Sequence, residues 1–129
     1  MRIAIFENEY ETIENAFKYL NMKYYGNSLT FTNYPRSNSI NNVTELSPFN
    51  LVIIDLDLSS ASELDGFGLI KKIERDPTTI PNILILTGQQ LSEDYAKDQG
   101  LQKNYPVLEK PINYNKLYAK FKEIGLTYP

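Results

Sequence analysis

Predicted strands alternate with helical patterns along nearly the whole chain, and this alternation constrains the fold more than any other feature. Residues 13–24 show the helical spacing well, because Ile13, Phe17 and Leu20 recur three or four positions apart. The predicted strands cover residues 2–6, 28–34, 51–54, 83–86 and 107–108. Strands and helices in this order favour an α/β fold, in which helices cover both faces of a parallel sheet.

About five helices are expected, at residues 13–24, 40–46, 67–76, 92–99 and 115–124. Glycine and proline mark several of their ends, and a serine marks one start, because these residues stop helices or cap them. The expected boundary residues are Gly26-Asn27, Asp76-Pro77, Ser92, Gly100 and Gly125-Leu126. The segment from Pro35 to Pro48 is polar, and its helix at residues 40–46 has the weakest pattern.

Composition limits the class of protein. The 129 residues fit one domain, residues 1–129, and 42% of them are hydrophobic, enough for a core. The net charge of −3 offers no general attraction to nucleic acid or to an anionic membrane. Cysteine and histidine are both absent, which excludes disulfides and the usual zinc ligands. No export signal or membrane-spanning run is visible, so a cytoplasmic location is expected.

Four of the five predicted strands end in a polar group that is able to do chemistry. Glu7 and Asn8 follow the first strand, Asp55 ends the third, Thr87 the fourth, and Lys110 follows the fifth. The carboxyl ends of parallel strands meet at one edge of a sheet, where ligands bind if the strand order reverses there. If the first and third strands are central neighbours, these side chains converge.

This set of groups suits phosphoryl transfer. Oxygen ligands such as Glu7, Asn8 and Asp55 match a hard cation like Mg2+ (or Mn2+). Asp55 has the chemistry to attack phosphorus directly, as aspartate does in enzymes that form an aspartyl phosphate. Lys110 would neutralise a phosphoryl oxygen, and the Thr87 hydroxyl would donate a hydrogen bond to another.

Five segments in this order give the chain its resemblance to a known family. They are Ile5-Phe6-Glu7-Asn8-Glu9, Leu51-Val52-Ile53-Ile54-Asp55, Asp65-Gly66, Ile83-Leu84-Ile85-Leu86-Thr87-Gly88 and Glu109-Lys110-Pro111. The chain resembles the receiver domains of response regulators, the CheY-like family of two-component signalling systems. The resemblance covers essentially the whole chain. It implies a flavodoxin-like, doubly wound sheet of five parallel strands in the order 2-1-3-4-5.

The resemblance also implies a role for each site residue. Asp55 would be the phosphoacceptor, and Asp57 would lend its backbone carbonyl to the metal beside Glu7, Asn8 and Asp55. Thr87 matches the switch hydroxyl of the family, and Lys110 matches its invariant lysine. The Lys110-Pro111 bond is often cis in such domains. The implied activity is phosphotransfer for signalling rather than conventional enzymatic turnover.

Three departures from the family pattern concern the site. Asn8 stands where the family usually has an aspartate, so weaker Mg2+ binding is expected. The loop from Asp55 to Asp65 is longer than usual by about three residues, which residues 59–63 fill, and it either partly covers the site, alters partner choice or is a tolerated surface insertion. Val107 replaces the aromatic switch of the family, and Tyr105, two residues earlier, is a possible substitute.

The implied partners are a sensor histidine kinase or a phosphotransfer protein, and an output domain or effector that the sequence does not name. In the family, the surface formed by the fourth helix, fifth strand and fifth helix usually carries the signal to a partner, and a homodimer through it is one possible assembly. Here that surface would fall on residues 92–99, 107–109 and 115–124.

Two other functions compete with this interpretation. A degenerate receiver that only binds proteins is favoured slightly by Asn8 and Val107, and disfavoured by Asp55, Thr87 and Lys110. The Asp-x-Asp pair at Asp55 also resembles the start of haloacid-dehalogenase phosphatases. That family needs acidic metal ligands after its lysine, where this chain has only Glu123, and it usually has its nucleophile on the first strand.

Overall fold

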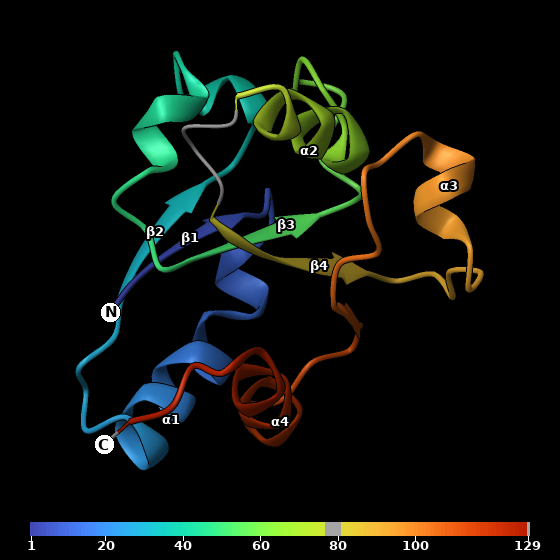
Figure 1. Ribbon diagram of the computed structural model, residues 1–129. Helices are drawn as coiled ribbons and strands as arrows, with labels where there is room; N and C mark the ends of the chain where they lie inside the picture. The colour runs from blue at the N-terminus through green and yellow to red at the C-terminus, as the bar shows by residue number, and fades with distance from the viewer. Residues whose placement is uncertain (77–80, 129) are drawn as a thin grey trace.

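The computed structural model describes residues 1–76 and 81–128 (Figure 1). Within them, strands alternate with α-helices and with short 3-10 helices. In chain order the elements are β1 (Arg2–Phe6), η1 (Tyr10–Thr12), α1 (Glu14–Tyr24), β2 (Thr30–Tyr34), η2 (Ser37–Ser39), η3 (Val43–Leu46), β3 (Leu51–Asp55), α2 (Gly66–Glu74), β4 (Asn82–Thr87), α3 (Tyr95–Gln99), β5 (Val107–Glu109) and α4 (Tyr114–Ile124).

The five strands form one parallel sheet in the order β2-β1-β3-β4-β5. The predicted flavodoxin-like topology is therefore confirmed. β1 and β3 are central neighbours, with Ile5 paired to Ile53, and Asp55 pairs with Leu86 on β4. Because the strand order reverses between β1 and β3, the edge beyond their carboxyl ends is where this type of fold places a ligand.

Helices cover both faces of the sheet, as Figure 1 shows. α1 and α4 lie together on one face with η1, and α2 lies on the other with η2 and η3. All five residues of β3 are buried, which a central strand covered on two sides requires. Each face has its own apolar cluster: one includes Phe17, Leu20, Leu117 and Phe121, and the other includes Val43, Leu46, Leu69, Ile70 and Ile73.

The helix expected at residues 40–46 is a 3-10 helix over Val43–Leu46, so the described residues hold four α-helices rather than five. Asn42 caps this element by accepting from the Thr44 N–H, while Glu45 accepts from the backbone of Asn42 and Asn41. This reciprocal capping holds a single helical turn, and that turn buries the side chains of Val43 and Leu46.

Several expected helix ends are confirmed, and one start is wrong. Gly26 and Gly100 adopt positive φ after α1 and α3, and at the end of α4 the Leu126 N–H donates to the Phe121 carbonyl past Gly125. Ser92 does not cap α3, which begins at Tyr95; its carbonyl only accepts from the Tyr95 N–H. α2 ends at Glu74, and the predicted stop at Pro77 lies outside the described residues.

Gly66 allows α2 to touch the end of β3. A Cβ atom added at Gly66 would lie 2.5 Å from the Asp55 carbonyl oxygen and 2.6 Å from the Leu56 Cα. The Gly66 N–H also donates to the Leu56 carbonyl at 3.3 Å. Asp65 caps the helix by accepting from the Gly68 N–H at 2.7 Å. The Asp65-Gly66 pair therefore fixes the first turn of α2 against the backbone of Asp55.

We predict that Gly66→Ala lowers the free energy of unfolding by about 1–3 kcal/mol, because the new methyl group meets backbone atoms that have no rotamer to adopt. Urea unfolding would measure the change. Gly88→Ala is the matched control, since a Cβ there meets nothing within 4 Å. Equal stability of the two variants would contradict this account of the close approach.

Candidate functional site

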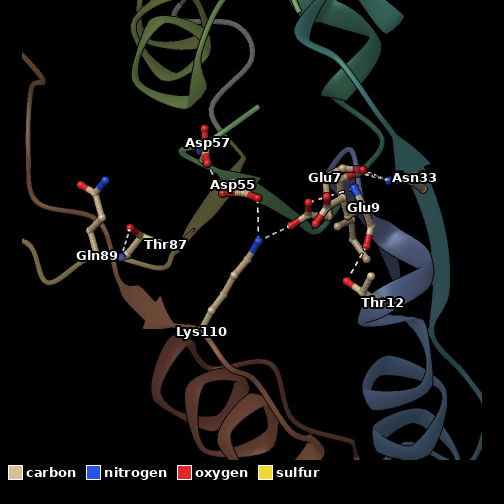
Figure 2. A network of polar contacts seen from close by, with 10 residues as sticks. Glu7, Glu9, Thr12, Asn33, Asp55, Asp57, Thr87, Gln89 and Lys110 are labelled. Atoms are coloured by element: carbon tan, nitrogen blue, oxygen red, sulfur yellow. Dashed lines mark hydrogen bonds and ion pairs between the residues drawn. The ribbon is translucent and has the colours of Figure 1, made fainter. Parts of the chain in front are cut away.

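The candidate site lies at the carboxyl edge of the sheet, as Figure 2 shows. Glu7 follows β1, Asp55 ends β3, Thr87 ends β4 and Lys110 follows β5. Glu7, Asp55 and Thr87 are buried, with exposed fractions of 1%, 2% and 3%. The strand-end residues predicted from the sequence therefore share one edge, and three of them are withdrawn from solvent.

Lys110 joins the two buried acids. Its Nζ lies 2.7 Å from Glu7 Oε2 and 2.7 Å from Asp55 Oδ2. In Figure 2 its side chain extends from below and ends between the two carboxylates. The expected convergence of these three groups is thus a feature of the fold. Two buried carboxylates next to one another need such a cation, because burial and mutual repulsion both disfavour their charges.

Backbone hydrogen bonds hold these residues in place. The Lys110 N–H donates to the Thr87 carbonyl at 2.8 Å, which fixes the lysine beside β4. The Glu7 N–H donates to the Tyr34 carbonyl at 3.1 Å, and the Asn33 side-chain amide donates to the Glu7 carbonyl at 3.0 Å. Neighbouring strands therefore set the backbone positions of Lys110 and Glu7.

The remaining polar atoms of the site are held by short local turns. The Asp57 N–H donates to Asp55 Oδ1 at 2.9 Å, and the Gln89 N–H donates to Thr87 Oγ1 at 3.0 Å. The bond from Gln89 uses a lone pair of the threonine oxygen, so the hydroxyl is still able to donate its hydrogen to a ligand oxygen. Gln89 was not predicted as part of the site. Its position two residues after Thr87 is the one sequence feature that could have indicated it.

The electrostatic setting favours a charged lysine beside a carboxyl group that is a weaker acid than usual. Burial, together with neighbouring Asp55, raises the pKa of Glu7 from 4.5 to about 7, against opposing contributions from Lys110 and the Glu9 N–H. Burial alone would lower the pKa of Lys110, but its bonds to Asp55 and Glu7 outweigh burial and raise it above 10.5. Lys110 is therefore a cation throughout the neutral pH range.

The oxygen atoms at this edge have the right chemistry for a hard cation, with less charge than expected for a strong site. Carboxylates of Glu7 and Asp55, the amide of Asn8 and the carbonyl of Asp57 are all ligands that Mg2+ accepts. Among residues 1–76 and 81–128, however, no three or more acidic, histidine or cysteine side chains gather as a metal site. Two carboxylates suit a metal ion that keeps several water ligands and binds with low affinity.

A pocket of about 370 Å³ adjoins this edge. Asp57 and Thr87 line it together with Gln89, and Phe67 and Leu91 supply apolar walls. The pocket offers room for a phosphoryl group and water beside the threonine hydroxyl. It was not predicted, because its walls come from the loops after β3 and β4 and from α2, which have no shared local pattern.

Tyr105 does not join the other predicted site residues. It precedes β5, is buried, and donates its hydroxyl hydrogen to Glu74 Oε2 of α2 at 2.6 Å. Its backbone N–H and carbonyl both bond the Tyr95 hydroxyl at 2.6 Å. Val107 pairs with Ile85, two residues before Thr87 on β4. A role for Tyr105 as a switch therefore stays a prediction.

Solved structures with the same fold are numerous, while no protein-family model and no curated protein matches the chain. A two-component response regulator from Clostridium difficile is 22% identical with a TM-score of 0.71, covering 96% of this chain and 94% of its own. The chemotaxis protein CheY4 of Vibrio cholerae is 15% identical, also with a TM-score of 0.71, covering 95% and 97%.

A receiver-domain protein of Bacillus halodurans gives a similar result, with 22% identity, a TM-score of 0.70 and 96% of each chain covered. The chain has the fold of a response-regulator receiver domain. The resemblance drawn from five sequence segments is thus confirmed at the level of the fold. In this receiver fold, none of the helices within residues 1–76 and 81–128 has the length and apolar character to span a membrane.

We predict that Asn8→Asp tightens Mg2+ binding to this receiver fold by at least about tenfold, because one more negative charge near a divalent ion contributes roughly a few kcal/mol before desolvation. Isothermal titration calorimetry would measure the dissociation constant. Asn15→Asp adds the same charge on an exposed part of α1 and serves as the control. Equal effects of the two variants would argue against a metal site at Asn8.

Proposed function

We propose that residues 1–129 form a receiver domain that accepts a phosphoryl group on Asp55. The observation that carries the proposal is the placement of Lys110 Nζ 2.7 Å from both Asp55 Oδ2 and Glu7 Oε2. A carboxylate that must approach an anionic donor needs a fixed cation beside it. The fold, the resemblance of the five segments and the free hydroxyl hydrogen of Thr87 support the same function.

In the proposed reaction an Asp55 carboxylate oxygen attacks the phosphorus of a phosphohistidine on a sensor histidine kinase or phosphotransfer protein. An oxygen–phosphorus bond forms, the nitrogen–phosphorus bond breaks, and the electron pair leaves with the histidine of the donor. Lys110 neutralises a phosphoryl oxygen, and Thr87 donates its hydroxyl hydrogen to another. Mg2+ held by Glu7, Asn8, Asp55 and the Asp57 carbonyl would supply further positive charge when bound.

The signal would leave through the surface formed by α3, β5 and α4, which corresponds to the output surface implied by the resemblance. A groove of about 350 Å³ lies along β5 and α4, lined by Val107, Leu108, Glu109, Lys116, Ala119 and Lys120. An effector, an output domain or a second copy of the chain would bind this surface after the phosphorylated population increases.

A protein-binding domain that is never phosphorylated is the second candidate. The specific observation in its favour is that the site brings together two carboxylates, with Asn8 in place of a third. The phosphatase alternative has less support, because Asp55 lies on β3 rather than on the first strand, and Glu123 on α4 is paired with Lys120. We therefore keep the phosphoacceptor as the proposed function.

We predict that incubation with acetyl phosphate and Mg2+ adds one phosphoryl group to the protein, measured as a mass increase of the intact chain. Asp55→Asn removes the nucleophile while keeping the size of the side chain, and a sample without metal removes the cation. Both should lack the adduct. An exposed acid outside the site, Asp94, gives the matched variant Asp94→Asn, which should be labelled like the parent.

An adduct that persists in Asp55→Asn would assign the acceptor to another residue. Absence of any adduct in the parent, across short reaction times and high Mg2+ concentration, would favour the protein-binding alternative.

A further inference from the structure

Residues 59–63, predicted to be an insertion, are tied to another part of the chain through one of their serines, although most of them are exposed. Ser62, within the long loop between Asp55 and Asp65, bonds to Ser37 on the segment that follows β2. The Ser37 N–H donates to Ser62 Oγ at 2.9 Å, and the two hydroxyl oxygens are 2.9 Å apart. Ser37 is itself buried, with 6% of its surface exposed. The two serines thus join segments 25 positions apart in the sequence.

Leu64 closes this contact into a ring. Ser62 Oγ lies 2.6 Å from the Leu64 carbonyl oxygen, and the Leu64 N–H donates to Ser37 Oγ at 2.8 Å. A carbonyl only accepts, so the Ser62 hydroxyl hydrogen goes to Leu64, and the Ser37 hydroxyl supplies the hydrogen shared by the two serines. Every donor in the ring then has an acceptor, which makes it a closed and mutually polarised network.

The ring is one of several anchors of the loop that follows Asp55. Others are the bonds from the Leu56 N–H to β4 at 3.0 Å and from the Gly66 N–H to the Leu56 carbonyl at 3.3 Å, and the buried side chain of Leu58. Asp57 lies between these anchors, and its N–H donates to Asp55 Oδ1 at 2.9 Å. The side chain of Asp57 is exposed, so the position of its backbone depends on the anchors on both sides of it, of which the ring is the last before α2.

We propose that Ser62 is a positioning residue of the Asp55 site. Its hydrogen-bond ring with Ser37 and Leu64 restrains the loop so that the Asp57 N–H keeps its hydrogen bond to Asp55 Oδ1. The proposal extends the function proposed above. Only its phosphorylation readout depends on that function. The extra residues act through this ring rather than by covering the site. Loss of the ring widens the range of positions of the Asp57 backbone, which carries both the N–H on Asp55 and the candidate metal carbonyl.

The first readout is the exchange of individual amide hydrogens by NMR, with Ile53 in β3 as an internal reference for global opening. Ser62→Ala and Ser37→Ala should each raise the exchange rate of the Asp57 amide by about tenfold relative to Ile53, because each breaks the same ring. In the Ser37→Ala/Ser62→Ala double variant, the Asp57 amide should exchange little faster than in either single variant. Ser60→Ala, an exposed serine of the same loop, should match the parent, and Ser62→Thr should restore protection.

The second readout is the initial rate of phosphorylation by acetyl phosphate, which should fall by about threefold to tenfold in Ser62→Ala and recover in Ser62→Thr. If Asp57 exchange is unchanged in Ser62→Ala and Ser37→Ala, the positioning role is refuted. Faster exchange of the Asp57 amide with an unchanged rate of phosphorylation would make the ring merely structural and would also overturn the proposal. If the parent itself is not phosphorylated, the proposed function fails, while Asp57 protection still decides the positioning role.

Discussion

The placement of one lysine between two buried acids is the interaction on which the site depends. Glu7 and Asp55 are each at most 2% exposed, and Lys110 Nζ reaches both at 2.7 Å. Two such carboxylates would be expensive to bury without a cation, since desolvation and repulsion act in the same direction. The parallel sheet solves this by bringing three strand ends to one edge, and the bond from the Lys110 N–H to the Thr87 carbonyl fixes the distance.

This arrangement also explains why Asn8 is compatible with a stable site. A third carboxylate at this edge would add repulsion to a pair in which burial and Asp55 already raise the pKa of Glu7 to about 7. An amide at Asn8 adds no such charge. Under the proposed function, the cost would fall on cation binding, because an amide oxygen attracts Mg2+ less than a carboxylate does.

Much of the fold and part of the site could be predicted because the relevant signals are local. Buried strands such as residues 51–54 end at polar residues, and the parallel topology then brings Glu7, Asp55 and Lys110 to one edge. The 3-10 helix at Val43–Leu46 was predicted as an ordinary helix, because an apolar pair three residues apart suits either type.

Other contacts had no local signal at all. Ser62 bonds a residue 25 positions away, and Tyr105 bonds Glu74 across 31 positions. Serine and tyrosine occur often on surfaces, so neither residue type indicates such a partner. Tyr105 was named as a possible substitute for the aromatic switch, but the strand begins only at Val107. Tyr105 bonds instead to Glu74 of α2 and to Tyr95 of α3. Only the packed chain defines these bonds.

The contact at Gly66 has a mechanical consequence. Side chains usually separate a helix from a sheet, and their rotamers absorb small displacements at one surface before these reach the other. At Gly66 the helix backbone rests directly on the carbonyl of Asp55 and the Cα of Leu56, with no such cushion. A shift of the Asp55 backbone toward α2 therefore meets the backbone of the first helical turn with no side chain between them to absorb it.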